Sequence, residues 1–172
     1  MSTKTIGDRT YKALTYLYQN SKEIQDVYLK NSHPINEKWH AKELGTVKIS
    51  TARGAGHSTA IVKFLLAHKA EKWAVVALNL GIASRMFDTI ISLAKEKKTP
   101  IAKAYPNYIG FKHGEIFFMS GKNFDEQLRG RQLDGIIIDG AFSLSPSQID
   151  QLYKTGEPCM FFNKYRFFIF VQ

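Results

Sequence analysis

The sequence is poor in cysteine, with Cys159 as its single thiol in 172 residues. One thiol cannot form a disulfide within the chain, and so low a cysteine content is typical of a reducing compartment. No apolar run approaches the roughly 20 residues of a membrane-spanning helix. The first eight residues also lack the apolar stretch of a signal peptide. We therefore expect a cytoplasmic protein without a membrane partner.

Acidic residues are also scarce, with 15 Asp and Glu against 24 Lys and Arg, which gives a formal net charge of +9. A basic surface favours an acidic partner, most simply nucleic acid, although a generally basic soluble protein would have the same balance. The five histidines show no zinc-ligand spacing. Hydrophobic residues make up 44% of the chain, which excludes a disordered protein. We expect one domain over residues 1–172, with residues 1–45 as an N-terminal helical segment packed on it.

Hydrophobic periodicity predicts alternating helices and strands. The predicted helices cover residues 8–30, 35–44, 58–68, 82–97 and 146–153. The predicted strands cover residues 47–50, 73–78, 135–139, 159–162 and 166–171. Residues 108–111 and 115–120 flank Lys112-His-Gly114 and predict a β-hairpin, followed by a polar connector over 124–130. This order predicts an α/β fold whose mostly parallel sheet is flanked by helices on both faces.

Residues 51–58 resemble a phosphate-binding loop that lacks its lysine. The pattern G-x-x-x-x-G-K-[ST] is matched at Gly56 and Ser58, but Thr51 replaces the first glycine and His57 replaces the lysine. A strand before the loop and a helix after it supply the expected context. Backbone amides and a helix N-terminus can hold phosphate without the lysine. A protonated His57 would favour binding at lower pH, whereas a neutral replacement after loss of function is the alternative.

A buried strand that ends in Asp139 has the form of the second half of such a site. In phosphate-loop enzymes this aspartate helps to hold Mg²⁺ beside the phosphates. A glutamate that orients the attacking water usually follows it, but Gly140 stands here. The alternative is that Asp139 only caps the next turn. The two motifs together, in this order, favour a P-loop fold.

At this point the chain resembles the ATPase domain of the large terminase subunit, the DNA-packaging motor of tailed phages. The resemblance covers about residues 47–153 and rests on three stretches: Thr51-Ala-Arg-Gly-Ala-Gly-His-Ser58, residues 110–120, and Leu128-Arg-Gly130 followed by residues 133–139. It implies a P-loop NTPase-like fold of the ASCE type with a β-hairpin insertion. We would then expect a stand-alone relative without the terminase nuclease domain, located in the host cytoplasm.

The resemblance also implies roles for individual residues. It implies that Ser58 and Asp139 are ligands of Mg²⁺, and that Arg53 and Asp139 are catalytic if the chain hydrolyses ATP. The resemblance implies that a nucleotide is bound by residues 53–59: Arg53, Gly54, Ala55, Gly56, His57, Ser58 and Thr59. Because His57 and Gly140 depart from the family pattern, we expect a slow or inactive ATPase.

An active but deviant ATPase would need replacements for the two missing groups. Arg53 or Lys48 would replace the lysine, and Glu115 or Asp134 would act on water. Asn163 is a weak candidate for a nucleotide sensor, and Arg129 matches a family arginine without an assigned role.

Four basic residues near the hairpin and its connector are candidates for contacts with nucleic acid: Lys112, Lys122, Arg129 and Arg131. Scattered solubilising charge is the alternative. The sequence favours a viral, degenerate terminase-like protein that binds nucleic acid, with DNA favoured and RNA left open, and that has retained or vestigial ATP binding. One alternative is the active deviant ATPase. The other is a non-catalytic protein that docks on a viral motor, a capsid, a host factor or a second copy of itself.

Overall fold

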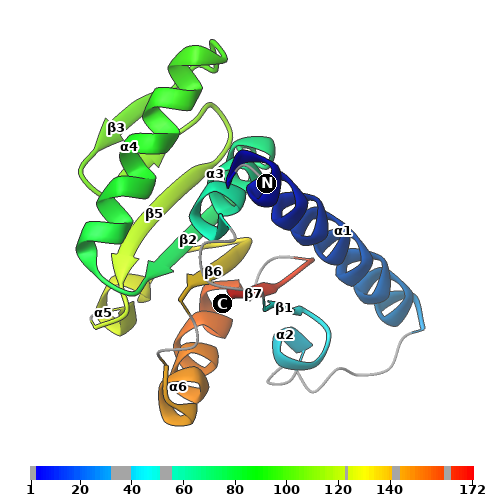
Figure 1. Ribbon diagram of the computed structural model, residues 1–172. Helices are drawn as coiled ribbons and strands as arrows, with labels where there is room; N and C mark the ends of the chain where they lie inside the picture. Colours follow the sequence, from blue (N-terminus) through cyan, green and yellow to red (C-terminus); the bar gives the residue numbers. More distant parts are fainter. Residues whose placement is uncertain (1–2, 32–39, 51–55, 123, 141–143, 161–163) are drawn as a thin grey trace.

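The computed structural model describes residues 3–31, 40–50, 56–122, 124–140, 144–160 and 164–172. These residues form a seven-stranded sheet in the order β1-β7-β6-β2-β5-β4-β3 (Figure 1). Its strands are β1 (Thr46–Ile49), β2 (Lys72–Ala77), β3 (Lys103–Tyr105), β4 (Tyr108–Gly110), β5 (Glu115–Ser120), β6 (Gly135–Asp139) and β7 (Phe167–Val171). Strands β1, β7, β6, β2 and β5 run parallel, which confirms the mostly parallel sheet.

Strands β4 and β5 form the predicted β-hairpin, with Ile109 opposite Ile116. The hairpin extends the sheet because β5 also pairs in parallel with β2. Strand β3 was not predicted. It pairs antiparallel with β4 and forms the far edge of the sheet.

Helices cover both faces of the sheet, as the alternating pattern predicted (Figure 1). One face carries α1 (Thr3–Lys30), α3 (His57–Ala67) and α4 (Leu80–Glu96). The other carries α5 (Phe124–Leu128), α6 (Pro146–Gly156) and the 3-10 helix η2 (Glu157–Met160), while the short α2 (His40–Glu43) precedes β1. Successive residues of the central strands alternate between the two cores, so that Ile137 packs on the α3 face and Ile138 on the α6 face.

Two predictions about the connections were wrong. The connector after the hairpin contains α5, because Phe124 and Leu128 are buried one helical turn apart. Cys159 and Met160 belong to η2 and not to a strand. The thiol of Cys159 donates to the Leu128 carbonyl oxygen at 3.1 Å, which ties η2 to the end of α5. Among the described residues, no helix has the length and apolar character needed to cross a lipid bilayer.

Candidate nucleotide-binding site

The strand order brings the carboxyl ends of β1, β7, β6 and β2 to one edge of the sheet. Val171 of β7 is in register with both Ile49 of β1 and Asp139 of β6. Asp139 is also in register with Ala77 at the end of β2. Strand β7 therefore separates the strand before the phosphate loop from the strand that carries Asp139. This edge is where ligands bind in open parallel sheets.

Helix α3 begins at the same edge with glycine as its N-cap residue, which has no side chain to cap the first amides. Gly56 takes up the N-cap position in the left-handed region, at φ 70°, where glycine has no steric penalty. The first backbone hydrogen bond of the helix runs from the Ala60 amide to the Gly56 carbonyl at 2.9 Å. By contrast, Asn79 caps α4 and Ser145 caps α6 through their side chains. The first amides of α3 have the geometry of an anion-binding site.

Ser58, in the first turn of α3, lies against Asp139. Its hydroxyl donates to Oδ2 of Asp139 at 3.1 Å. Asp139 is only 8% exposed, and this burial raises the pKa of its carboxyl group. The Ser58 hydrogen bond, the charge of His57 and the Gly140 amide act in the opposite direction. The structure thus places a hydroxyl and a carboxylate oxygen together beside the first amides of α3.

Magnesium fits this pair of residues, because it prefers hard oxygen ligands and keeps several waters. Serine and aspartate are the two residue types that hold Mg²⁺ in P-loop proteins. Where side chains are described, no group of three or more His, Cys, Asp or Glu gathers as an alternative metal centre. The ligands of any bound ion would therefore be completed by phosphate and water.

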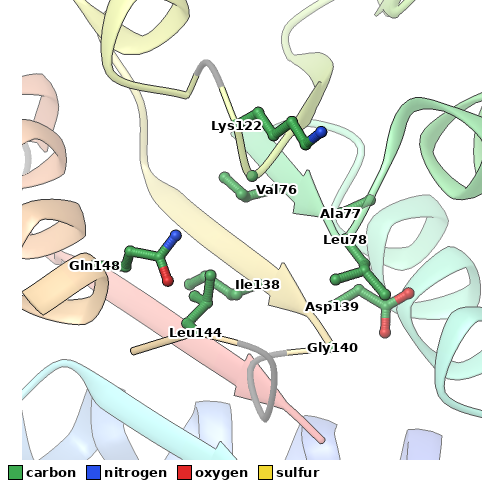
Figure 2. A pocket seen from close by; sticks show the side chains of 10 residues that line it. Val76, Ala77, Leu78, Lys122, Ile138, Asp139, Gly140, Leu144 and Gln148 are labelled. Atoms are coloured by element: carbon green, nitrogen blue, oxygen red, sulfur yellow. The ribbon is translucent and has the colours of Figure 1, made fainter. Parts of the chain in front are cut away.

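A pocket of about 140 Å³ lies on the α6 side of Asp139, among the ends of β2, β5 and β6 (Figure 2). Figure 2 shows Leu144 and Gln148 on one side of Asp139, whose carboxylate points away from them. Gly140, at φ 80°, stands where the family pattern has the glutamate that orients water. Among the residues that line this pocket, Asp139 is the acidic one. The pocket thus offers no second carboxylate for that role.

Glu115 and Asp134, the two candidates to replace the missing glutamate, lie at the amino-terminal ends of their strands. Asp139 lies at the opposite, carboxyl end. Asp134 precedes β6 and accepts from the Lys72 amide at 2.7 Å, and Glu115 begins β5 with its Oε1 3.6 Å from the Lys72 ammonium. Asp134 lies five positions before Asp139, about 16 Å at the usual rise of a strand. The expectation that Glu115 or Asp134 acts on water is therefore wrong.

Lys48 does not face α3 either. Its ammonium lies 5.9 Å from the centre of the Phe170 ring, which belongs to the core on the α6 face. Its neighbours Val47 and Ile49 belong to the core on the α3 face. Lys48 therefore does not take the place of the missing lysine. Arg53, Gly54, Ala55 and Asn163 lie outside the described residues, so their predicted roles stay predictions.

The four basic residues predicted to contact nucleic acid do not gather at one edge. Lys112 precedes β5 and Lys122 follows it, so they flank opposite ends of this strand. The Arg131 guanidinium lies over the Phe117 ring at 3.9 Å, and Arg129 is exposed beyond α5. Only Lys122 lines the pocket beside Asp139. The four therefore do not form one compact patch, and their contacts with nucleic acid stay a prediction.

A second cleft, of about 310 Å³, lies between α3 and α4 and was not predicted. It is lined by Ser58, Thr59, Val62, Ile82, Arg85, Met86 and Thr89. It brings Arg85 of α4 beside the first turn of α3. No sequence signal points to Arg85, because its place depends on how two helices pack on the sheet and not on a local motif.

Comparison with solved structures supports the resemblance at the level of the fold. The HK97 bacteriophage large terminase matches with a TM-score of 0.56 and 17% identity over 73% of this chain and 29% of that chain. The ATPase domain of the Thermus phage P74-26 large terminase matches with a TM-score of 0.54 and 16% identity over 80% and 64%. A thermophilic bacteriophage large terminase in complex with ADP gives 0.50 and 14% over 79% and 38%.

The fold is thus that of the P-loop ATPase domain of phage large terminases, as the sequence motifs predicted. The chain spans less than two thirds of the length of these relatives. No protein-family model matches it, and no curated protein matches it in sequence.

Proposed function

We propose that this chain is a terminase-like P-loop protein of viral origin that binds a magnesium nucleotide at the N-terminus of α3. The contact between Ser58 and Asp139 carries the proposal. It joins Ser58, on the helix that follows β1, to Asp139, at the end of β6. The two residues are 81 positions apart in the sequence. The solved relative in complex with ADP gives independent support for a nucleotide as the ligand.

Each residue of the site has a defined part in binding. The first amides of α3 donate to phosphate oxygens, and Gly56 lets the backbone turn into the helix. Ser58 and Asp139 supply oxygen ligands for Mg²⁺, which would neutralise phosphate charge when bound. Gly140 offers no carboxylate to orient water, so the site favours binding over rapid hydrolysis.

Nucleic acid is the proposed partner, with DNA favoured by the resemblance to a packaging motor. The net charge of +9 supports an acidic partner. Lys112, Lys122 and Arg129 are exposed in the structure. Binding would depend steeply on salt, because phosphate contacts release condensed counterions.

Calorimetric titration with Mg²⁺ and ATP tests the nucleotide site. We expect micromolar binding that Asp139→Ala and Ser58→Ala weaken strongly, while Glu96→Ala, at the far end of α4, leaves it unchanged. Absence of binding at millimolar ATP in the wild type contradicts the proposal. Steady-state phosphate release, with and without DNA, then separates a binding protein from the deviant ATPase, whose turnover Asp139→Ala would abolish.

A salt titration of fluorescent DNA and RNA tests the partner. Affinity for DNA that falls steeply with salt supports it, and Lys122→Ala and Arg129→Ala should reduce the slope by about one counterion each. A protein that binds neither nucleotide nor nucleic acid but associates with itself in light scattering would support the interaction-protein alternative.

A further inference from the structure

The cleft between α3 and α4 has a chemistry that the proposed nucleotide site does not use. Its polar lining combines the hydroxyls of Ser58 and Thr59 on α3 with Arg85 and Thr89 on α4. Val62, Ile82 and Met86 form its apolar walls. Ser58 is shared with the site at Asp139, so the cleft opens directly beside the proposed position of the phosphates.

Arg85 brings positive charge to this cleft. The side chain is exposed, and its Nε donates to the Gly81 carbonyl at 3.3 Å, one helical turn earlier. Where the chain is described, no carboxylate forms an ion pair with Arg85. A guanidinium has five N–H donors and keeps its charge at every pH at which a protein is folded. The N–H groups of the Arg85 guanidinium other than Nε–H are therefore available to bind an anion.

The described lysines near the site are directed elsewhere. Lys63, on the same helix as Ser58, pairs with Asp8 of α1. Lys48 lies over Phe170 on the α6 face, and Lys122 lines the pocket on the α6 side of Asp139. Arg85 is the cation that shares a cleft with the first turn of α3.

We propose that Arg85 binds the phosphate chain of a nucleotide seated at the N-terminus of α3 and supplies charge that the absent loop lysine would give. This inference rests on the proposed function. Arginine suits the task because its planar fork donates two parallel hydrogen bonds to phosphate oxygens. The ligand class is a polyphosphate, so inorganic tripolyphosphate should bind by the same contact as ATP.

The test compares Arg85→Gln and Arg85→Lys with Lys95→Gln, which removes an exposed charge from the last turn of the same helix. Each is titrated calorimetrically with Mg²⁺ and ATP and with Mg²⁺ and tripolyphosphate. Because a hydrogen bond to a charged group is strong, Arg85→Gln should weaken both ligands about tenfold. Arg85→Lys should retain part of the affinity, and Lys95→Gln should bind as the wild type does.

Urea unfolding of each variant shows whether the fold is intact, and an exposed position such as Arg85 is expected to be neutral. Wild-type affinity in Arg85→Gln, with binding still lost in Asp139→Ala, overturns the role of Arg85 and leaves the nucleotide site standing. An equal loss in Arg85→Gln and Lys95→Gln also overturns it, since only general charge would then matter. A wild type that binds neither probe at millimolar concentration overturns both proposals.

Discussion

The Tyr18 hydroxyl donates to the carboxylate of Glu71, with both carboxylate oxygens 3.0 Å from it. Tyr18 belongs to α1 and is 2% exposed, whereas Glu71 directly precedes β2. The Tyr18 ring also packs against Phe64 of α3 and Phe167 of β7. A single side chain thus joins the N-terminal helix to the sheet and to the helix of the candidate site.

Removal of this hydroxyl should destabilise the protein without changing the packing. We expect Tyr18→Phe to lower the free energy of unfolding by about 1 kcal/mol, because the Glu71 carboxylate loses a buried donor. Urea denaturation measures the change. Tyr16→Phe, two residues away and 70% exposed, is the matched control and should have no effect. Equal stability of the two variants would show that the Tyr18 hydrogen bond contributes nothing.

Tyr18 should also make the folded protein less stable at alkaline pH. Burial, and next the charge of Glu71, raise the pKa of Tyr18 above its ordinary value of 10.0. The fold therefore favours the neutral phenol, and its contribution is complete below pH 10 and is lost as pH rises further. Urea midpoints between pH 9 and 11.5 should fall more steeply for the wild type than for Tyr18→Phe. Parallel curves would contradict this assignment.

The buried carboxylate of Asp139 is expected to lower the stability of the folded protein when no ligand is bound. Since burial is the main cause of its raised pKa, the ionised carboxylate is disfavoured in the folded protein without ligand. Asp139→Asn keeps the shape and removes the charge, so it should raise the thermal midpoint while it abolishes binding of magnesium nucleotide. Asp150→Asn, at an exposed position on α6, should do neither. A lower midpoint for Asp139→Asn would mean that the carboxylate is needed for folding.

Gly114 is expected to tolerate no side chain. A Cβ atom there would lie 2.4 Å from the Glu71 carbonyl oxygen and 2.6 Å from that of Lys69, both of them backbone atoms. Gly114→Ala should therefore lower the free energy of unfolding by about 2 kcal/mol or more, as overpacking against backbone does. At Gly121 the nearest atom would be 3.6 Å away, and Gly121→Ala should be nearly neutral in the same denaturation experiment.

The elements predicted from sequence were those whose signal is local. Residues 135–139 form β6 as predicted, because the apolar run of residues 136–138 is typical of a central strand covered on both faces. Strand β3 carries no such signal: its three residues are exposed, and backbone pairing with β4 holds it. Residues 159 and 160 are as apolar as a strand, yet they fill the core from a 3-10 helix. Burial alone therefore does not distinguish a strand from a 3-10 helix.

The residues of the candidate site, too, could be predicted only where their signal is local. Ser58 and Asp139 follow from motifs at strand and helix ends, and the structure brings them together. The choice of Glu115 and Asp134 was wrong because Glu115 begins β5 and Asp134 directly precedes β6, whereas the phosphate edge lies where strands end. Arg85 could not be predicted, because its position opposite Ser58 comes from the packing of α4 beside α3.

The position of β7 between β1 and β6 has a consequence for synthesis on the ribosome. Strands β1 and β6 make no direct pair, and β7 comes after both of them in the chain. While residues 167–171 are still inside the exit tunnel, strands β1 and β6 lack the strand that pairs with both of them. The long-range pairings that join them form last, and such pairings are the slow ones. The nascent chain therefore completes its phosphate edge only after residues 167–171 have left the tunnel.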